Sequence, residues 1–249
     1  MDLVSIAGVL LAILAVFGGN FLEGGQPEEL MNLPALVIVL GGTFAAAAVQ
    51  SPRDDFRRAF RLLRWSFGKN RLDYEEGIHQ VVSWCVIARR KGLLGLEAEI
   101  GKQSDLFLRN ALQLLVDGRT PDVIHGVLEA ELVSREQRDL RGAKVIESMG
   151  GYAPTLGIIG AVLGLIHVMS NLASPDSLGA GIATAFVATI YGIGLANLFL
   201  LPVAGKIRAL VQQRFHYQEM MLEGLIYIAE GQNPRVIQLR LQGYLDQDA

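Results

Sequence analysis

The chain has 249 residues, of which 51% are hydrophobic and 19% are charged, and its formal net charge is −3. All 22 Lys and Arg residues lie in 51–149 and 206–249, whereas the apolar residues are concentrated elsewhere. A soluble α/β domain of this length would spread its apolar residues along the chain, so this distribution argues against that class.

Four stretches contain no Asp, Glu, Lys or Arg: 3–22, 33–51, 148–175 and 177–205. Because about 20 apolar residues suffice to cross the hydrocarbon core of a membrane, each stretch is long enough for a transmembrane helix. The first stretch lacks the basic flank and the small-residue cleavage site of a signal peptide, so we interpret it as a retained span.

Basic residues flank the second, third and fourth stretches on one side only, and the opposite loops carry only acids. The positive-inside rule therefore places both termini and residues 51–149 in the cytoplasm. We predict an all-α integral membrane protein with four transmembrane helices and a large helical cytoplasmic domain. Its segments are a transmembrane hairpin at 1–50 (spans about 3–22 and 33–51), a cytoplasmic domain at 51–149, a second hairpin at 150–205, and a C-terminal helix and tail at 206–249. The acids of the opposite loops are Glu23, Glu28, Glu29 and Asp176.

The cytoplasmic regions have helical patterns. Ser51-Pro52 predicts a helix start, and Phe56, Phe60 and Leu63 then recur on one face among arginines. These features indicate a basic amphipathic helix near the membrane surface.

Further helix starts are expected near Asp73, Ser104 and Thr120, and the last of these helices is expected to run into the third span. Helical spacing after the fourth span continues to Gly231, and Asn233-Pro234 is predicted to end it.

The predicted spans carry no Asp, Glu, Lys or Arg, and His167 is their one histidine. Pumps and proton relays need such groups at membrane depth, so either the protein moves no ions or a partner supplies the carrier. We find no phosphate loop, metal cluster or nucleophile–base pair, and expect no enzyme activity, no cofactor, no metal and no nucleic-acid partner. Cys85 is the single cysteine, which excludes an internal disulfide.

Small residues follow one another at helical spacing in the last two spans, and such residues let helices approach closely in lipid. Two interpretations stay open: ordinary packing within the chain, or a strip that receives a partner's helix. Thr189 and Tyr191 add hydroxyls beside this strip, although a Thr hydroxyl in a helix often bonds only the carbonyl one turn back. The small residues are Gly157, Gly160, Ala161 and Gly164 in span three and Ala180, Thr184, Ala188, Gly192 and Ala196 in span four.

Two prolines lie at the cytoplasmic ends of these spans. Pro154 marks the entry of span three, and Pro202 should kink the helix because it removes the hydrogen bond to the Leu198 carbonyl. The kink is interpreted either as static or as a joint between the span and the cytoplasmic region.

Residues 88–99 place the bases Arg89 and Arg90 before the acids Glu97 and Glu99. Alternation of this kind is typical of a solvated face, with a protein-docking surface as the second interpretation.

Taken together, these elements resemble the flagellar motor stator A-subunit family of the MotA/PomA type. The resemblance covers nearly the whole chain, and its most specific stretches are 152–166 (YAPTLGIIGAVLGLI) and 188–192 (ATIYG) with Pro202 beyond. Arg89 and Glu97 match the spacing of the family's rotor-facing charges.

The resemblance implies a homopentamer of A-subunits in the bacterial inner membrane around two B-subunits, each with an essential membrane Asp and a peptidoglycan-binding domain. Ions, here protons, would pass between A and B and drive a rotor switch-complex protein. The residues implied are Arg89, Glu97, Arg90 and Glu99 for the rotor, Pro154 and Pro202 for conformational coupling, Ala161, Thr189 and Tyr191 for the ion pathway, and Gly157, Gly160, Gly164 and Gly192 for helix packing. Sodium-driven members resemble one another in a Thr where Ala161 stands, and alanine offers sodium no oxygen ligand.

Three other hypotheses remain. An energiser of the Ton/Tol type also relies on an Asp from a partner protein. Such energisers resemble a three-span plan, whereas 3–51 is predicted to form a hairpin of two spans. A self-contained channel conflicts with the uncharged spans, and a membrane scaffold would move nothing.

Overall fold

The computed structural model describes residues 3–68, 72–170 and 175–245, and every regular element in these ranges is helical. This confirms the all-α class. The chain divides into two compact units, residues 1–70 with 138–209 and residues 71–137 with 210–249. Two long helices, α8 (Pro121–Ser170) and α10 (Leu201–Ala229), continue from one unit into the other.

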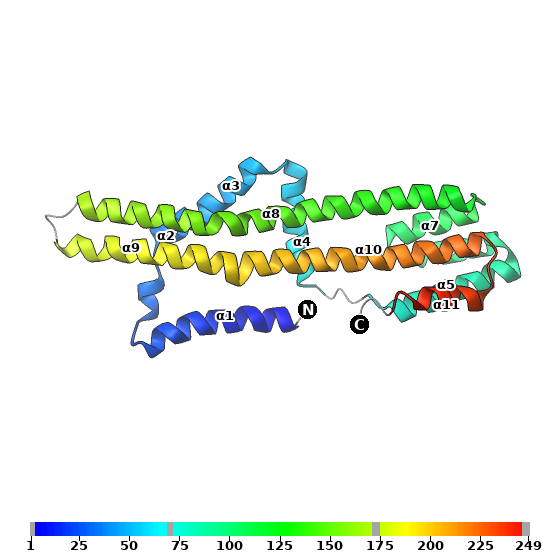
Figure 1. The fold of residues 1–249 in the computed structure, drawn as a ribbon, viewed down its shortest axis with the longest axis horizontal. Coiled ribbons are helices and arrows are strands. Elements are labelled where there is room, and N and C mark those ends of the chain that lie inside the picture. The colour runs from blue at the N-terminus through cyan, green and yellow to red at the C-terminus, as the bar shows by residue number, and fades with distance from the viewer. Residues whose placement is uncertain (1–2, 69–71, 171–174, 246–249) are drawn as a thin grey trace. The chain divides into compact units, whose positions relative to one another are not determined.

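The first unit contains the longest apolar helical segments, and Figure 1 labels its helices. The stretch 33–50 is helical throughout but includes a widened (π) turn, η2, at Val37–Gly41. The turn between α8 and α9, with the Asp176 side chain predicted to face the far side of the membrane, lies outside the described residues. The elements of this unit are α1 (Leu3–Leu22), η1 (Pro27–Leu30), α2 (Leu33–Leu36), η2, α3 (Gly42–Gln50), α4 (Arg53–Ser66), the second part of α8, α9 (Pro175–Gly194), the π turn η4 (Leu195–Leu200) and the start of α10.

Helix α8 confirms the predicted run from Thr120 into the third span. Its 50 residues form one helix about 75 Å long. Pro154 lies inside it, where the missing N–H leaves the carbonyl of Gly150 without its usual helical donor.

The helix that contains Pro202 accommodates the proline with a widened turn. Residues 195–200 form the π turn η4, and the N–H of Leu201 donates to the carbonyl of Ala196, one residue further back than in an α-helix. Because a proline ring collides with the carbonyl one turn before it, a wider turn at this point gives the ring room. Span four and α10 therefore follow one another as continuous helix.

Helices α8 and α9 lie side by side with their backbones in contact (Figure 1). A Cβ added to Gly157 would lie 2.9 Å from the carbonyl oxygen of Ala188, and one added to Gly192 would lie 2.6 Å from that of Ala153. These distances leave no space for any side chain, so the glycines are required by packing within the chain.

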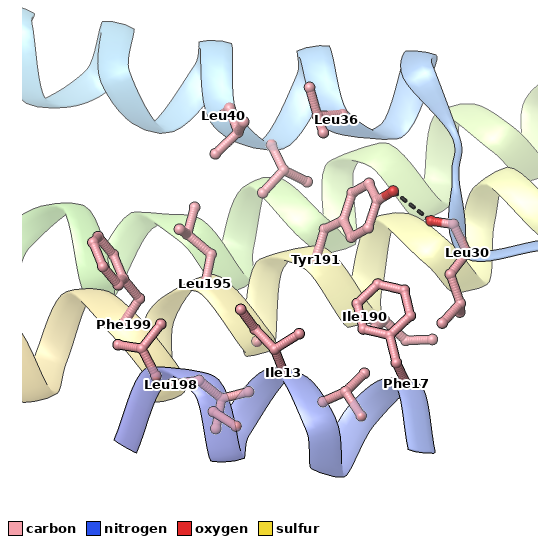
Figure 2. Close-up of a pocket in the computed structure, with 15 residues that line it drawn as sticks. Ile13, Phe17, Leu30, Leu36, Leu40, Ile190, Tyr191, Leu195, Leu198 and Phe199 are labelled. Carbon is pink, nitrogen blue, oxygen red and sulfur yellow. Dashed lines mark hydrogen bonds between the residues drawn. The ribbon is translucent and has the colours of Figure 1, made fainter. Parts of the chain in front are cut away.

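A group of polar contacts ties the start of α2 to α9. The Asn32 side chain accepts from the Ala35 N–H at 3.0 Å and donates to Thr184 Oγ1 at 2.8 Å. The Tyr191 hydroxyl donates to the carbonyl of Leu30 (Figure 2). Asn32 thus acts as both a helix cap and a link between two predicted spans.

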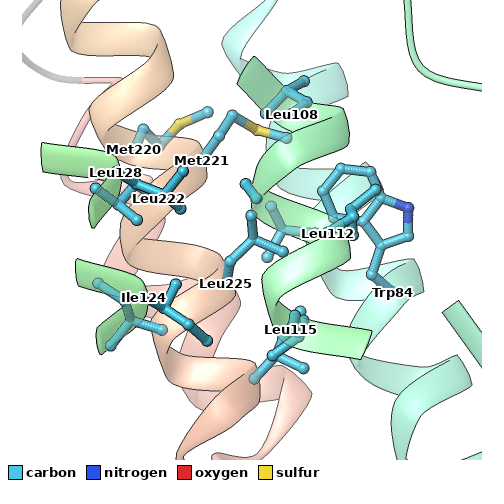
Figure 3. Packing of buried hydrophobic residues seen from close by; sticks show 14 of the residues in the cluster. Trp84, Leu108, Leu112, Leu115, Ile124, Leu128, Met220, Met221, Leu222 and Leu225 are labelled. Carbon is cyan, nitrogen blue, oxygen red and sulfur yellow. The ribbon is translucent and has the colours of Figure 1, made fainter. Parts of the chain in front are cut away.

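The second unit has a conventional hydrophobic core (Figure 3). Its helices are α5 (Tyr74–Lys91), η3 (Leu93–Leu96), α6 (Glu97–Ile100), α7 (Leu106–Val116), α11 (Pro234–Gln242) and parts of α8 and α10. Burial of each large apolar side chain contributes roughly 1.5–3 kcal/mol to the free energy of folding. Its largest buried side chains are Trp84, Leu96, Phe107, Leu112, Leu115, Ile124, Leu128, Met220, Met221, Leu225 and Ile237.

Helix boundaries follow the predicted caps in part. Asp73 caps α5, as expected. The cap of α4 is Pro52, so the predicted Ser51 cap is wrong by one residue, and α7 is capped by Asp105. Helix α10 ends at Ala229, before Asn233-Pro234, as predicted, and Asn233 then caps a further helix, α11, in the segment predicted as a tail.

Three helical segments in the described residues are long and apolar enough to cross a membrane by length and composition. They are Leu33–Gln50 and the apolar parts of Pro121–Ser170 and Leu178–Ala229. The apolar part of α1, Ile6–Leu22, is a shorter apolar helix of 17 residues.

The backbone contact between α8 and α9 yields a stability prediction. Gly192→Ala should destabilise the protein by about 1–3 kcal/mol, the usual cost of overpacking, because the added methyl meets the Ala153 carbonyl. Thermal unfolding of the purified protein in detergent measures this. Gly194→Ala, two residues away and with no atom within 4 Å of an added Cβ, is the matched control and should not destabilise. Equal unfolding temperatures for the two variants would contradict the packing argument.

Candidate functional site

The predicted spans present apolar side chains. Among the described residues of α8 and α9, large exposed side chains include Ile158, Val162, Leu165, Phe186 and Ile193. Because the facing backbones of these two helices touch, no ion path fits between them.

A cavity of about 370 Å³ lies between α1, residues 30–40 and the α9–η4 helix (Figure 2). Tyr191 is the one polar side chain among its lining residues, and its hydroxyl is already bonded to Leu30. The cavity therefore offers no set of oxygen ligands for a cation. Its other lining residues include Ile13, Phe17, Leu36, Leu40, Ile190, Leu195, Leu198 and Phe199.

The three residues predicted for an ion pathway occupy different surroundings. The Thr189 hydroxyl donates to the carbonyl of Ala185 at 3.1 Å, one turn back, as Thr side chains in helices often do. Tyr191 lines the cavity beside α1. Ala161 is half-buried on α8, one turn after Gly157. The two hydroxyls thus make different contacts: that of Tyr191 bonds the Leu30 carbonyl, and that of Thr189 stays within its own helix.

The two prolines lie close to contacts between α8 and the start of α10. A Cβ on Gly150, four residues before Pro154, would lie 2.6 Å from the side chain of Leu201, the residue before Pro202. Arg208, six residues after Pro202, donates to Glu147 at 2.5 Å. The helices are therefore held together beside both prolines, where each lacks one backbone donor.

The charges of residues 88–99 flank a tight turn. Helix α5 ends at Lys91, Gly92 has a φ of 73° that favours glycine, and η3 leads into α6. Arg89, Arg90 and Glu97 are exposed, and no ion pair involves them in the described part of the chain.

Glu99 differs from the other three charges of this segment. It pairs with Lys102 at 2.7 Å, three residues along. Three of the four predicted rotor-facing charges thus have no ion-pair partner among the described residues.

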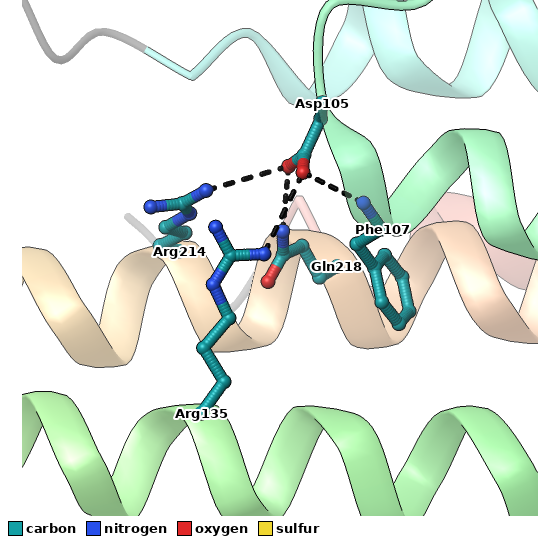
Figure 4. Close-up of polar contacts among 5 residues, drawn as sticks. All are labelled: Asp105, Phe107, Arg135, Arg214 and Gln218. Atoms are coloured by element: carbon teal, nitrogen blue, oxygen red, sulfur yellow. Dashed lines mark hydrogen bonds and ion pairs between the residues drawn. The ribbon is translucent and has the colours of Figure 1, made fainter.

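Sequence reasoning missed the contacts of Asp105, which joins three helices of the second unit (Figure 4). Its carboxylate accepts from the Phe107 N–H at 3.0 Å and from Gln218 Nε2 at 2.6 Å, and lies 3.6 Å from both Arg135 and Arg214. The residue before an apolar helix predicts a cap, but no local pattern indicates the three distant partners.

Cys85 has a structural environment. It is buried, its thiol lies 3.6 Å from the Gln232 carbonyl, and burial raises the pKa of the thiol. A raised pKa keeps the thiol protonated and unreactive. No group of His, Cys, Asp or Glu suited to a metal occurs among the described residues.

Comparison with known proteins places the chain in a family. Residues 99–220 match the MotA/TolQ/ExbB proton channel family. Motility protein A of Bacillus subtilis (strain 168) is 38% identical over 246 residues, which covers 98% of this chain and 91% of the relative.

Two solved structures share the fold over nearly the whole chain. C. jejuni MotAB has a TM-score of 0.92 at 33% identity, covering 98% of this chain and 96% of that chain. The flagellar MotAB stator complex from Bacillus subtilis has a TM-score of 0.88 at 37% identity, covering 97% and 95%. With this identity along its whole length, the chain belongs to the MotA/TolQ/ExbB proton channel family, among the motility protein A relatives.

Proposed function

We propose that this chain is the A-subunit of a bacterial flagellar motor stator, which forms an ion channel with a B-subunit and converts ion flow into torque. One observation carries the proposal: the chain is similar along its length to motility protein A, yet its described spans contain no Asp, Glu, Lys or Arg. The carrier group must then come from a second protein, which is the division of labour that a two-component channel requires.

We infer four transmembrane helices with both termini in the cytoplasm of a bacterial inner-membrane protein. Helix α1, with 20 residues, reaches the length that a span requires although its apolar part is short. The segments 1–50 and 150–205 would then form the two hairpins, and 51–149 and 206–249 would be cytoplasmic. The support is the restriction of every Lys and Arg to the two inferred cytoplasmic segments.

The proposed partners are a B-subunit with a membrane Asp and a peptidoglycan-binding domain, further copies of this chain in a pentamer, and a rotor protein. Solved relatives are MotAB assemblies, which supports the first. Ala161, Thr189 and Tyr191 are the proposed pathway residues on spans three and four, and the aspartate would approach these spans from outside this chain.

Arg89, Arg90, Glu97 and Glu99 are the proposed rotor contacts. A charged pair that meets opposite charges on a moving partner gives orientation and fast association more than affinity, which suits a transient mechanical contact. Because Glu99 is paired with Lys102, we expect it to contribute less than Glu97.

Pro154 and Pro202 are the proposed coupling points between ion binding and the cytoplasmic helices. Each interrupts the backbone hydrogen bonding of a helix that leaves the membrane, so bending there costs less than elsewhere in the helix.

The Ton/Tol-type alternative shares the family but fits less well. Such energisers resemble a three-span plan, whereas α1 and the helix through 33–50 supply two apolar helices before α4. The whole-length similarity to motility protein A also favours the stator reading.

Gene deletion separates the two functions. A strain without this chain should assemble flagella but not swim, and the wild-type gene should restore swimming in soft agar. A deletion strain that swims normally but shows impaired outer-membrane uptake would instead support the Ton/Tol alternative.

The rotor contact is tested by charge reversal. Arg89→Glu should reduce the swimming radius severalfold because the new carboxylate would face like charge on the rotor, and a compensating reversal on the rotor should restore part of it. Arg119→Glu, an exposed arginine outside the motif, is the control. Unchanged swimming of the Arg89 variant would exclude this residue from the contact.

The coupling ion is inferred to be the proton, because Ala161 provides no oxygen ligand for sodium. Swimming speed should fall when a protonophore is added and stay constant when sodium is replaced by potassium. Speed that follows the sodium concentration would overturn the argument.

A further inference from the structure

Helix α4 presents three distinct faces. Residues Asp55, Arg58, Ala59 and Leu62 form the face toward α8. The other two faces lie next to each other, because residues of one face follow residues of the other at spacings of three and four. They consist of Arg53, Arg57, Arg61 and Arg64 on one and Phe56, Phe60 and Leu63 on the other.

Helix α4 crosses α8 rather than running along it. Asp55 pairs with Arg141 at 3.3 Å, Arg58 pairs with Asp139 at 3.4 Å, and a Cβ on Gly142 would lie 2.9 Å from Leu62. The contacts extend over about 10 Å of α4 but only about 5 Å of α8. Figure 1 shows the same crossing. Since α8 continues into span three, α4 lies along the membrane plane.

The aromatic face of α4 packs against the second span. The Phe44 ring, six residues before the end of α3, lies 5.1 Å from the Phe56 ring and 5.8 Å from the Phe60 ring. The Tyr152 hydroxyl donates to Gln50 at 2.8 Å, which joins the cytoplasmic ends of spans two and three. These contacts place α4 at the inner membrane interface, with Phe60 still 40% exposed.

The arginine face carries unneutralised charge. Arg53, Arg57, Arg61 and Arg64 are exposed, and none forms an ion pair in the part of the chain that the structure describes. Arg58 on the opposite face, in contrast, is paired with Asp139. The four guanidinium groups therefore form a row about 17 Å long beside an aromatic strip.

We propose that α4 is a binding site for the headgroups of anionic phospholipids. Guanidinium groups bind phosphate oxygens in bidentate geometry, and a basic row next to an exposed apolar strip is the pattern of a helix that lies in the interface. Charge complementarity favours this occupant, since the cytoplasmic leaflet is negative and the row meets it directly after span two. The inference rests on the span assignment proposed above and is independent of the rotor contact.

Lipid titration tests the site on the complete complex with its B-subunit, purified in neutral detergent with lipid removed. Phosphatidylglycerol is the probe and phosphatidylcholine the neutral comparator, and native mass spectrometry reports the lipids retained. Arg57→Gln/Arg61→Gln should weaken phosphatidylglycerol binding about thirtyfold, since each basic residue near an anionic surface changes affinity by about fivefold. Arg57→Lys/Arg61→Lys keeps both positive charges and should weaken binding far less than the Gln pair, although the bidentate geometry is lost.

The matched control is Arg119→Gln/Arg235→Gln, which removes two exposed arginines of the second unit and should change affinity less than twofold. Thermal unfolding without lipid verifies that the variants fold. Should the Gln pair misfold, the wild-type preference for phosphatidylglycerol over phosphatidylcholine decides, and its absence would overturn the proposal.

Three outcomes would overturn the proposal. The first is equal retention of the two lipids, and the second is wild-type affinity in the Arg57→Gln/Arg61→Gln variant. The third is loss of assembly without any change in lipid affinity. This third outcome would assign the row to an interface between copies of the chain. Normal swimming of the deletion strain would contradict the stator function while leaving this lipid measurement unaffected.

Discussion

Direct backbone contact between α8 and α9 is the constraint on which the rest of the membrane unit depends. Lipid tails are as apolar as leucine side chains, so two helices gain little from burying leucine against one another and must gain from close approach. Gly157, Gly164, Gly181 and Gly192 allow that approach, and their missing side chains leave carbonyl oxygens in contact with the facing helix. The result is a rigid pair with no interior, so polar chemistry can occur only on its outer faces.

Each compact unit is stabilised internally by a different kind of interaction, because the two units meet different solvents. The unit built around Trp84, Leu112 and Leu225 buries large side chains as water-soluble domains do, and Asp105 adds a network of hydrogen bonds and ion pairs. The unit with the apolar helices relies on small residues and on a few hydrogen bonds such as Asn32 to Thr184. One chain thus uses the hydrophobic effect in one part and close packing in the other.

Much of this was predictable from sequence, for identifiable reasons. Blocks without charge indicate the long helices, and the small-residue spacing indicated close packing, although only the structure decides which helix faces which. Helix α11 was missed because Pro234 was taken as a terminator, whereas proline in a first turn also starts helices. The pairing of Glu99 with Lys102 is local and follows from their spacing of three.

Other features could not be found in one sequence. The partners of Asp105 come from α8 and α10, far along the chain, and nothing local distinguishes Asp105 from an ordinary cap. The prediction for Pro202 was right about the lost donor but did not foresee that a π turn would absorb the ring. Arg89 and Glu97 are exposed, in agreement with the alternation of charge in their segment. Completion of the proposed ion pathway depends on residues outside this chain.

The π turn before Pro202 also changes the direction in which the side chains after it point around the helix axis. A π turn contains about one residue more than an α turn, and each residue advances a helix by about 100°. Lys206 and Arg208 therefore point about a quarter of a circle away from the directions that an uninterrupted α-helix would give them. Deleting one residue between Leu195 and Leu200 would restore α geometry in the span and rotate everything after it, so the length of this turn governs which way the outgoing helix faces.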